Sequence, residues 1–253
     1  MNDEFYIGWE RKAPPGIGTT IHRAVAVLLL AAVLVPLVLA VSQTMIGTSV
    51  FEWGTHKKFA GIFIAQPYPH LLIPRPGQAG NHPADSTYYL VAQWKFGLAP
   101  AAVAPFDGKF VTLTGTLIYR GNQTMIETSP DWIQVAEKTS VTFLPHSLPL
   151  GKQTLTGEIV DSKCFLGVMN PGQLAPHRAC AIRCISGGIP PVLLVRQQDG
   201  AALYLLLVSA AGQPVNQQVL DLVAEPVQIT GDVERQGDLL ILRADPSTYR
   251  RLD

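Results

Sequence analysis

The strongest feature of the hydrophobic pattern lies near the start of this 253-residue chain. Residues 24–41 read AVAVLLLAAVLVPLVLAV, a run of 18 positions without a polar side chain. A helix needs about 20 apolar residues to cross the hydrocarbon core of a bilayer, and extending the run to residue 46 supplies them. The apolar region of a cleaved signal peptide is shorter, about 7 to 15 residues. The pattern predicts an uncleaved transmembrane helix over residues 24–46, after an N-terminal segment of residues 1–23.

Basic residues on either side of this run indicate its orientation. Arg11, Lys12 and Arg23 precede it, whereas Lys57 and Lys58 follow it after a long uncharged stretch. Segments with an excess of Lys and Arg close to a membrane span stay in the cytoplasm. We therefore expect a single-pass protein of the cell inner membrane that contacts lipid through its helix. Its N-terminus would be cytoplasmic, and its C-terminal body would be periplasmic or otherwise extracytoplasmic.

The body alternates apolar and polar positions, and it repeats. The segment VTLTGTLIYRGNQTMIE (111–127) aligns with VQITGDVERQGDLLILR (227–243) at an offset of 116, and both read as strand, glycine turn, strand. Upstream, residues 59–64 align with residues 155–160 at an offset of 96. The second copy has therefore gained about 20 residues relative to the first, which indicates a duplicated unit with an insertion.

Each copy holds four or five short strands and no long helix, which is typical of a small closed barrel such as the OB-fold. We predict a mainly β protein with two tandem OB-like barrels, residues 50–144 and 152–253, joined by a Pro-bounded linker over residues 145–150. A short helical pattern at residues 216–222 has residues 99–103 as its candidate counterpart in the first copy.

Charge limits the classes of partner. The chain has 19 Lys and Arg residues and 19 Asp and Glu residues, so it lacks the basic field on which non-specific nucleic-acid binding depends. We expect no nucleic-acid partner. Charged residues make up 15% of the chain, against about a quarter in ordinary globular domains, as expected for a membrane span joined to a β-rich body.

All three cysteines lie in the added segment, residues 162–188, which reads SKCFLGVMNPGQLAPHRACAIRCISGG. A proline before it and two glycines after it predict a helix over residues 177–185. Along that helix, His177, Cys180 and Cys184 are spaced i, i+3 and i+7 and share one face. Cys164 ends the preceding strand, and a turn at residues 170–172 would fold it back toward the other three.

Three interpretations of this segment remain open. In an oxidising compartment, Cys164 would form a disulfide with Cys180 or Cys184 and leave one thiol over. Alternatively, the three thiolates and the His177 imidazole would form a metal site, for which zinc and copper are the candidate ions.

The third interpretation is thiol redox chemistry. Lys163, Arg178 and Arg183 flank the cysteines, and neighbouring cations lower a thiol's pKa and favour the reactive thiolate. No C-x-x-C pair accompanies them. Two other histidines, His70 and His82, lie among prolines, and we expect both to be solvated loop residues.

The added segment resembles one found in poorly characterised bacterial proteins that are membrane-anchored or exported. The resemblance consists of a D-x-K-C strand end in DSKCFLGVMNPG and an H-x-x-C-A-x-x-C helix in HRACAIRCISGG. The matching positions are Asp161, Lys163, Cys164, His177, Cys180 and Cys184. This resemblance implies a bacterial exported protein, and it implies no particular activity.

Sequence motifs for catalysis are missing. There is no Gly-rich phosphate loop, no G-x-S-x-G elbow, no H-E-x-x-H and no C-x-x-C-H haem motif. We therefore expect an accessory protein rather than an enzyme. Its partner would be a membrane or periplasmic protein, for instance within a redox complex of the cell envelope. A metal-binding or thiol-redox module is the alternative.

Overall fold

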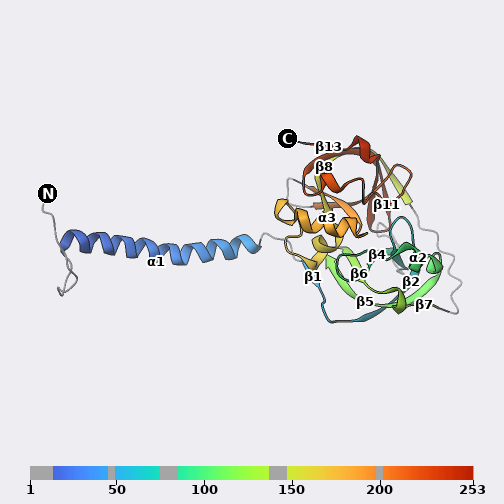
Figure 1. The fold of residues 1–253 in the computed structure, drawn as a ribbon, viewed down its shortest axis with the longest axis horizontal. Helices are drawn as coiled ribbons and strands as arrows, with labels where there is room; N and C mark the ends of the chain where they lie inside the picture. The colour runs from blue at the N-terminus through green and yellow to red at the C-terminus, as the bar shows by residue number, and fades with distance from the viewer. Residues whose placement is uncertain (1–13, 45–48, 75–84, 137–146, 198–201, 253) are drawn as a thin grey trace. The chain divides into compact units, whose positions relative to one another are not determined.

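The computed structural model describes residues 14–44, 49–74, 85–136, 147–197 and 202–252. The chain divides into two compact units, Met1–Gly47 and Thr48–Asp253. The first contains a single long helix and the second contains two barrels (Figure 1).

The helix α1 spans Pro15–Thr44, so it begins nine residues before the predicted span. It starts at a proline, which suits the first helical position because no backbone N–H is needed there. Its stretch Pro15–Ser42 is long and apolar enough to cross a membrane. Within this stretch, the 18 consecutive residues with the highest hydropathy are not buried against any described part of the chain. At 1.5 Å per residue this stretch is about 42 Å long, which exceeds the roughly 30 Å hydrocarbon core. Residues 45 and 46 of the predicted span lie outside the described residues.

The first barrel closes through five strands in the order β2-β3-β4-β6-β5 and back to β2. The pair β4 and β6 is parallel, and the other pairs of the barrel are antiparallel. The strands are β2 Lys57–Ile64, β3 His70–Pro74, β4 Asp85–Val91, β5 Phe110–Arg120 and β6 Gln123–Glu127. Smaller elements accompany them: β1 Ser49–Phe51, α2 Pro100–Val103, η1 Ala104–Phe106, η2 Pro130–Trp132 and β7 Ile133–Val135.

The second barrel repeats this order as β8-β9-β10-β12-β11 and back to β8, again with one parallel pair, β10 with β12. Its strands are β8 Ser147–Asp161, β9 Pro191–Arg196, β10 Ala202–Val208, β11 Pro226–Gln236 and β12 Leu239–Arg243. Its smaller elements are η3 Cys164–Val168, η4 Ala175–His177, α3 Arg178–Ser186, η5 Leu220–Leu222, η6 Pro246–Thr248 and β13 Arg250–Arg251. The prediction of two OB-like five-stranded barrels is confirmed.

Equivalent positions of the two barrels have the same local structure. Gly121 and Gly237 both have φ of 59° in the turn between the fourth and fifth strands, a left-handed conformation that suits glycine. Val111 pairs with Val135 of β7, and Val227 pairs with Arg251 of β13, at the same offset of 116. The repeat therefore extends to a short sixth strand in each copy.

Two details differ from the sequence predictions. β8 begins at Ser147, so residues 147–150 belong to a strand and not to a linker, while residues 145 and 146 lie outside the described residues. The helical segments expected at residues 99–103 and 216–222 are present only as short helical turns. These turns are α2 with η1 in the first barrel and η5 in the second. Both connect the third strand to the fourth, so the proposed equivalence of these two segments is confirmed.

The barrels share a third apolar core in addition to one core each. The shared core contains Val91, Ile118 and Met125 of the first barrel together with Val160 and Leu166 of the second. Each of these side chains is at most 1% exposed. Because burial of such side chains stabilises by about 1.5–3 kcal/mol each, the two barrels form one folding unit.

Candidate functional site

The inserted segment lies at the junction of the barrels. After β8, the turn η3 packs across β1 of the first barrel, where a Cβ on Gly167 would meet the carbonyl oxygen of Val50. The following turn at residues 170–172 folds back over Cys164: a Cβ on Gly172 would lie 2.7 Å from the carbonyl oxygen of Cys164. Gly172 also has φ of 68°. Glycine at both positions allows the segment to pack tightly enough to return Cys164 to α3.

The three cysteines converge as predicted. The Sγ of Cys164 lies 4.0 Å from the Sγ of Cys180 and 4.0 Å from that of Cys184. All three sulfurs lie within 4.8 Å of one another. No two are bonded, so the hypothesis of a disulfide is not confirmed. Cys164 and Cys184 are buried, whereas Cys180 is half-buried and is the accessible member of the cluster.

His177 takes a different position from the one its spacing predicts. It precedes α3 in the turn η4, and its Nε2 lies 2.9 Å from Oδ2 of Asp161. The other oxygen of Asp161 accepts a hydrogen bond of 2.8 Å from the backbone N–H of Cys164. His177, Asp161 and Cys164 therefore form a second cluster, which overlaps the three-sulfur cluster only at Cys164.

The thiols of Cys164 and Cys184 influence one another. Their contact raises the pKa of Cys164, and burial raises it further. The same contact lowers the pKa of Cys184, and either sulfur can be the donor in it. The contact with Cys164 therefore favours the thiolate form of Cys184. A thiolate is the form of cysteine that binds metal ions.

Lys95, which belongs to no motif of the sequence, provides a cation at the site. It lies between β4 and α2 of the first barrel, and its Nζ donates a 2.6 Å hydrogen bond to Sγ of Cys180. This contact raises the pKa of Lys95 and so keeps its ammonium group charged.

Lys163 contacts the first barrel rather than a sulfur. Its ammonium is buried, 2.5 Å from Oε2 of Glu127, and donates to the carbonyl oxygens of Ala92 and Trp94 at 2.8 and 2.7 Å. Three partners satisfy its three donors. Lys163 therefore holds in place the short segment that carries Lys95.

The two arginines of α3 also have other partners. Arg178 forms an ion pair with Glu225 and donates to the carbonyl oxygen of Asp221 at 3.2 Å. The guanidinium of Arg183 lies 5.3 Å from the centre of the Phe96 ring, within the range of a cation–π contact. Of the residues predicted to support the cysteines, Asp161 and Lys163 build the site and the arginines attach α3 to its surroundings.

The backbones of the two barrels meet beside the cysteines. The N–H of Gly97 donates to the carbonyl oxygen of Gly187 at 2.9 Å, and a Cβ on Gly97 would collide with the backbone of Gly188. Trp94 precedes this contact with φ of 61° and a 75% exposed side chain. Non-glycine residues with positive φ are uncommon and cluster at functional sites.

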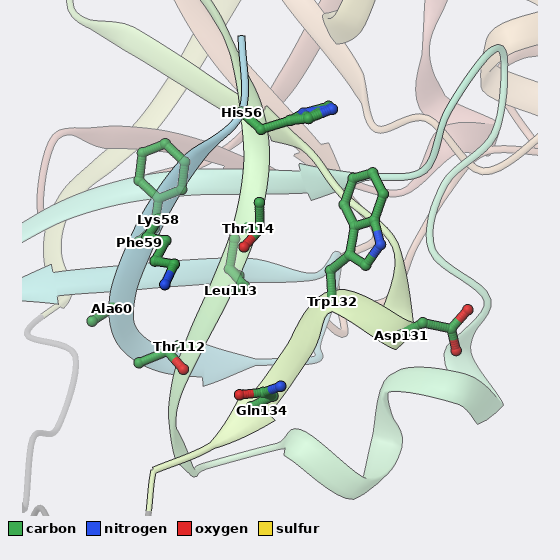
Figure 2. A pocket seen from close by; sticks show the side chains of 10 residues that line it. All are labelled: His56, Lys58, Phe59, Ala60, Thr112, Leu113, Thr114, Asp131, Trp132 and Gln134. Atoms are coloured by element: carbon green, nitrogen blue, oxygen red, sulfur yellow. The ribbon is translucent and has the colours of Figure 1, made fainter. Parts of the chain in front are cut away.

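A separate cavity of about 620 Å³ lies on the outer surface of the first barrel, lined by residues of β2, β5, η2 and β7 (Figure 2). His56 and Trp132 lie at one end in an edge-to-face contact, with ring centroids 5.3 Å apart, and Thr112 and Gln134 lie at the other. This cavity contains no cysteine, and its lining residues do not include those of the junction.

Comparisons with known proteins give no family for this chain. No family model matches it, and no curated protein matches it. One solved structure with some similarity is a deletion mutant of the single-stranded DNA binding protein from Thermus aquaticus, with 10% identity and a TM-score of 0.22 over 82% of this chain and 90% of that one. A similarity of this size carries no argument about fold or ligand.

Proposed function

We propose that this protein is a membrane-anchored, extracytoplasmic accessory protein that binds one thiophilic metal ion through Cys164, Cys180 and Cys184. The main support for this proposal is the convergence of the three sulfurs. Cys164 is 16 residues from Cys180 and 20 residues from Cys184 along the chain, yet its sulfur lies close to both of theirs. Only the packing of the inserted segment brings them together.

The spacing of the sulfurs suits a single ion. With metal–sulfur bonds of about 2.3 Å, sulfurs around one ion lie about 3.8 to 4.0 Å apart, and Cys164 is 4.0 Å from each of the other two. Thiolates select zinc and monovalent copper among the common ions. A bound ion would also protect three neighbouring thiols from oxidation in a compartment where free thiols tend to pair.

Two further features support the anchored accessory role. The apolar stretch of α1 is long enough to span a bilayer, and the basic residues before it favour a cytoplasmic N-terminus. Next to the cysteines, the exposed side chains of Trp94 and Phe96 offer an apolar surface for a membrane or periplasmic partner protein.

Metal analysis of the full chain, purified in detergent with a reductant, tests the binding site. We expect about one zinc or copper ion per chain in the wild type and none in Cys184→Ser. Ser186→Ala, on the same helix, is the matched control and should retain the ion. A wild-type protein with three titratable thiols that gains neither ion when both are supplied would contradict the proposal, as would a protein with only one titratable thiol.

Purification of the tagged protein from its native membrane tests the accessory role. We expect a partner protein to co-purify in a fixed ratio, and Trp94→Ala to reduce its yield. Recovery of the protein as a solitary monomer after mild detergent extraction would count against this role.

A further inference from the structure

We propose that the ion is monovalent copper, held by three sulfurs alone, and that Cys180 and Lys95 form the exit through which the ion passes to an acceptor. This inference rests on the proposed function and makes it more specific.

The coordination number follows from the ligands within reach. Among the described residues, the cluster around the three sulfurs contains no fourth ligand, since His177 groups with Asp161 and Cys164 instead. The Nε2 of His177 is already 2.9 Å from Oδ2 of Asp161. Structural zinc sites are almost always four-coordinate. Three soft thiolates without a fourth ligand suit monovalent copper better.

The order of exchange follows from burial. Cys164 is 3% exposed and Cys184 is 1% exposed, so an acceptor reaches neither of them first. Cys180 is the half-buried member of the cluster. In the exchange step, a ligand atom of the acceptor, either a thiolate sulfur or a chelator nitrogen, brings its electron pair to copper, the bond from copper to Cys180 breaks, and Cys180 leaves as a thiolate. Copper remains monovalent, so no oxidant or reductant is needed.

Lys95 is placed to act in that step. Its exposed ammonium is 2.6 Å from Sγ of Cys180, and it is available to hold the thiolate that leaves. Charge-assisted contacts of this kind are stronger than neutral hydrogen bonds. The segment carrying Lys95 is fixed by Lys163 on one side and by the Gly97–Gly187 hydrogen bond on the other. The first barrel therefore supplies the cation for a site whose sulfurs all belong to the second.

The identity of the ion is tested with the reduced, chelator-stripped full chain in detergent under nitrogen. Copper is supplied as its bathocuproine disulfonate complex and zinc as its chloride, separately and in competition. We expect one copper per chain, displacement of zinc by copper, and an X-ray absorption spectrum with three sulfur ligands and no nitrogen. His177→Gln should keep the stoichiometry and the sulfur shell.

A chain that binds zinc and resists copper, or a copper spectrum with a nitrogen ligand that His177→Gln removes, would overturn the inference and leave the proposed function standing. Binding of neither ion would overturn both.

The role of Lys95 is tested by stopped-flow transfer of copper from the loaded protein to excess bathocuproine disulfonate. We expect Lys95→Gln to slow transfer by about tenfold, as loss of one charge-assisted hydrogen bond predicts, with unchanged copper stoichiometry and melting temperature. Lys95→Arg should restore most of the rate, and Lys152→Gln, an exposed position on β8, is the control. Equal rates in the wild type and Lys95→Gln would overturn this role.

Discussion

The two barrels have the same strand order, yet only one of them contains the cysteines. In the first barrel, five residues connect the first and second strands, 65–69, whereas 29 residues, 162–190, do so in the second. The longer connection contains α3 and all three cysteines. The comparison shows that an insertion into one connection of a duplicated scaffold added a candidate site without changing the barrel that supports it.

The barrel without cysteines still contributes to that site. Its residues Lys95 and Glu127 contact Cys180 and Lys163 of the inserted segment. The inserted segment of the second barrel therefore depends on residues of the first barrel for these two contacts. Three experiments test how similar the two barrels are and how strongly they depend on one another, and they follow in order of expected effect.

Substitution of Lys163 has the largest expected effect. Lys163→Met leaves the Glu127 carboxylate buried without a partner, and breaking a buried ion pair in this way costs about 3–5 kcal/mol. We expect the free energy of unfolding in urea to fall by that amount. The double variant Lys163→Met with Glu127→Leu should recover part of the loss. If Lys163→Met unfolds like the wild type, the ion pair does not hold the barrels together.

Two matched glycines test the likeness of the barrels directly. Gly61→Ala places a Cβ against the carbonyl oxygen of Leu72, and Gly157→Ala places one against that of Leu194. Overpacking of this kind costs about 1–3 kcal/mol, and we expect similar losses from both variants in urea unfolding. A large loss in only one of the matched variants would show that the copies have diverged at this position.

Tyr68 tests a smaller contact between the barrels. Its hydroxyl oxygen accepts a 3.0 Å hydrogen bond from the backbone N–H of Val215 in the second barrel. Tyr68→Phe removes the acceptor, and we expect a loss of about 0.5–1.5 kcal/mol, measured as a lower urea midpoint. Tyr88→Phe, in the first barrel, is the control. An unchanged midpoint for Tyr68→Phe would mean that solvent replaces the lost acceptor.

Much of the fold could be predicted from local patterns in the sequence. Apolar runs identified α1, alternation with glycine turns identified the strands, and a fixed offset identified the duplication. The convergence of Cys180 and Cys184 followed from helical spacing alone. These features depend on residues that are close in sequence or repeat at a constant interval.

The parts that could not be predicted depend on contacts between distant segments. Lys95 lies 85 residues from Cys180, and no pattern in the sequence connects the two. His70, expected in a solvated loop, is 3% exposed in β3, where its Nδ1 lies 2.8 Å from the carbonyl oxygen of Tyr68. Burial lowers the pKa of this imidazole. The other histidine expected in a loop, His82, lies outside the described residues.

The shared core also limits where the chain can be divided into fragments that fold. A fragment ending after Val135 would expose Val91, Ile118 and Met125 to water, and a fragment starting at Ser147 would expose Val160 and Leu166. We therefore expect each half expressed alone to aggregate, and the two halves expressed together to assemble as a non-covalent heterodimer. Each of the two duplicated units would therefore fold only in the presence of the other.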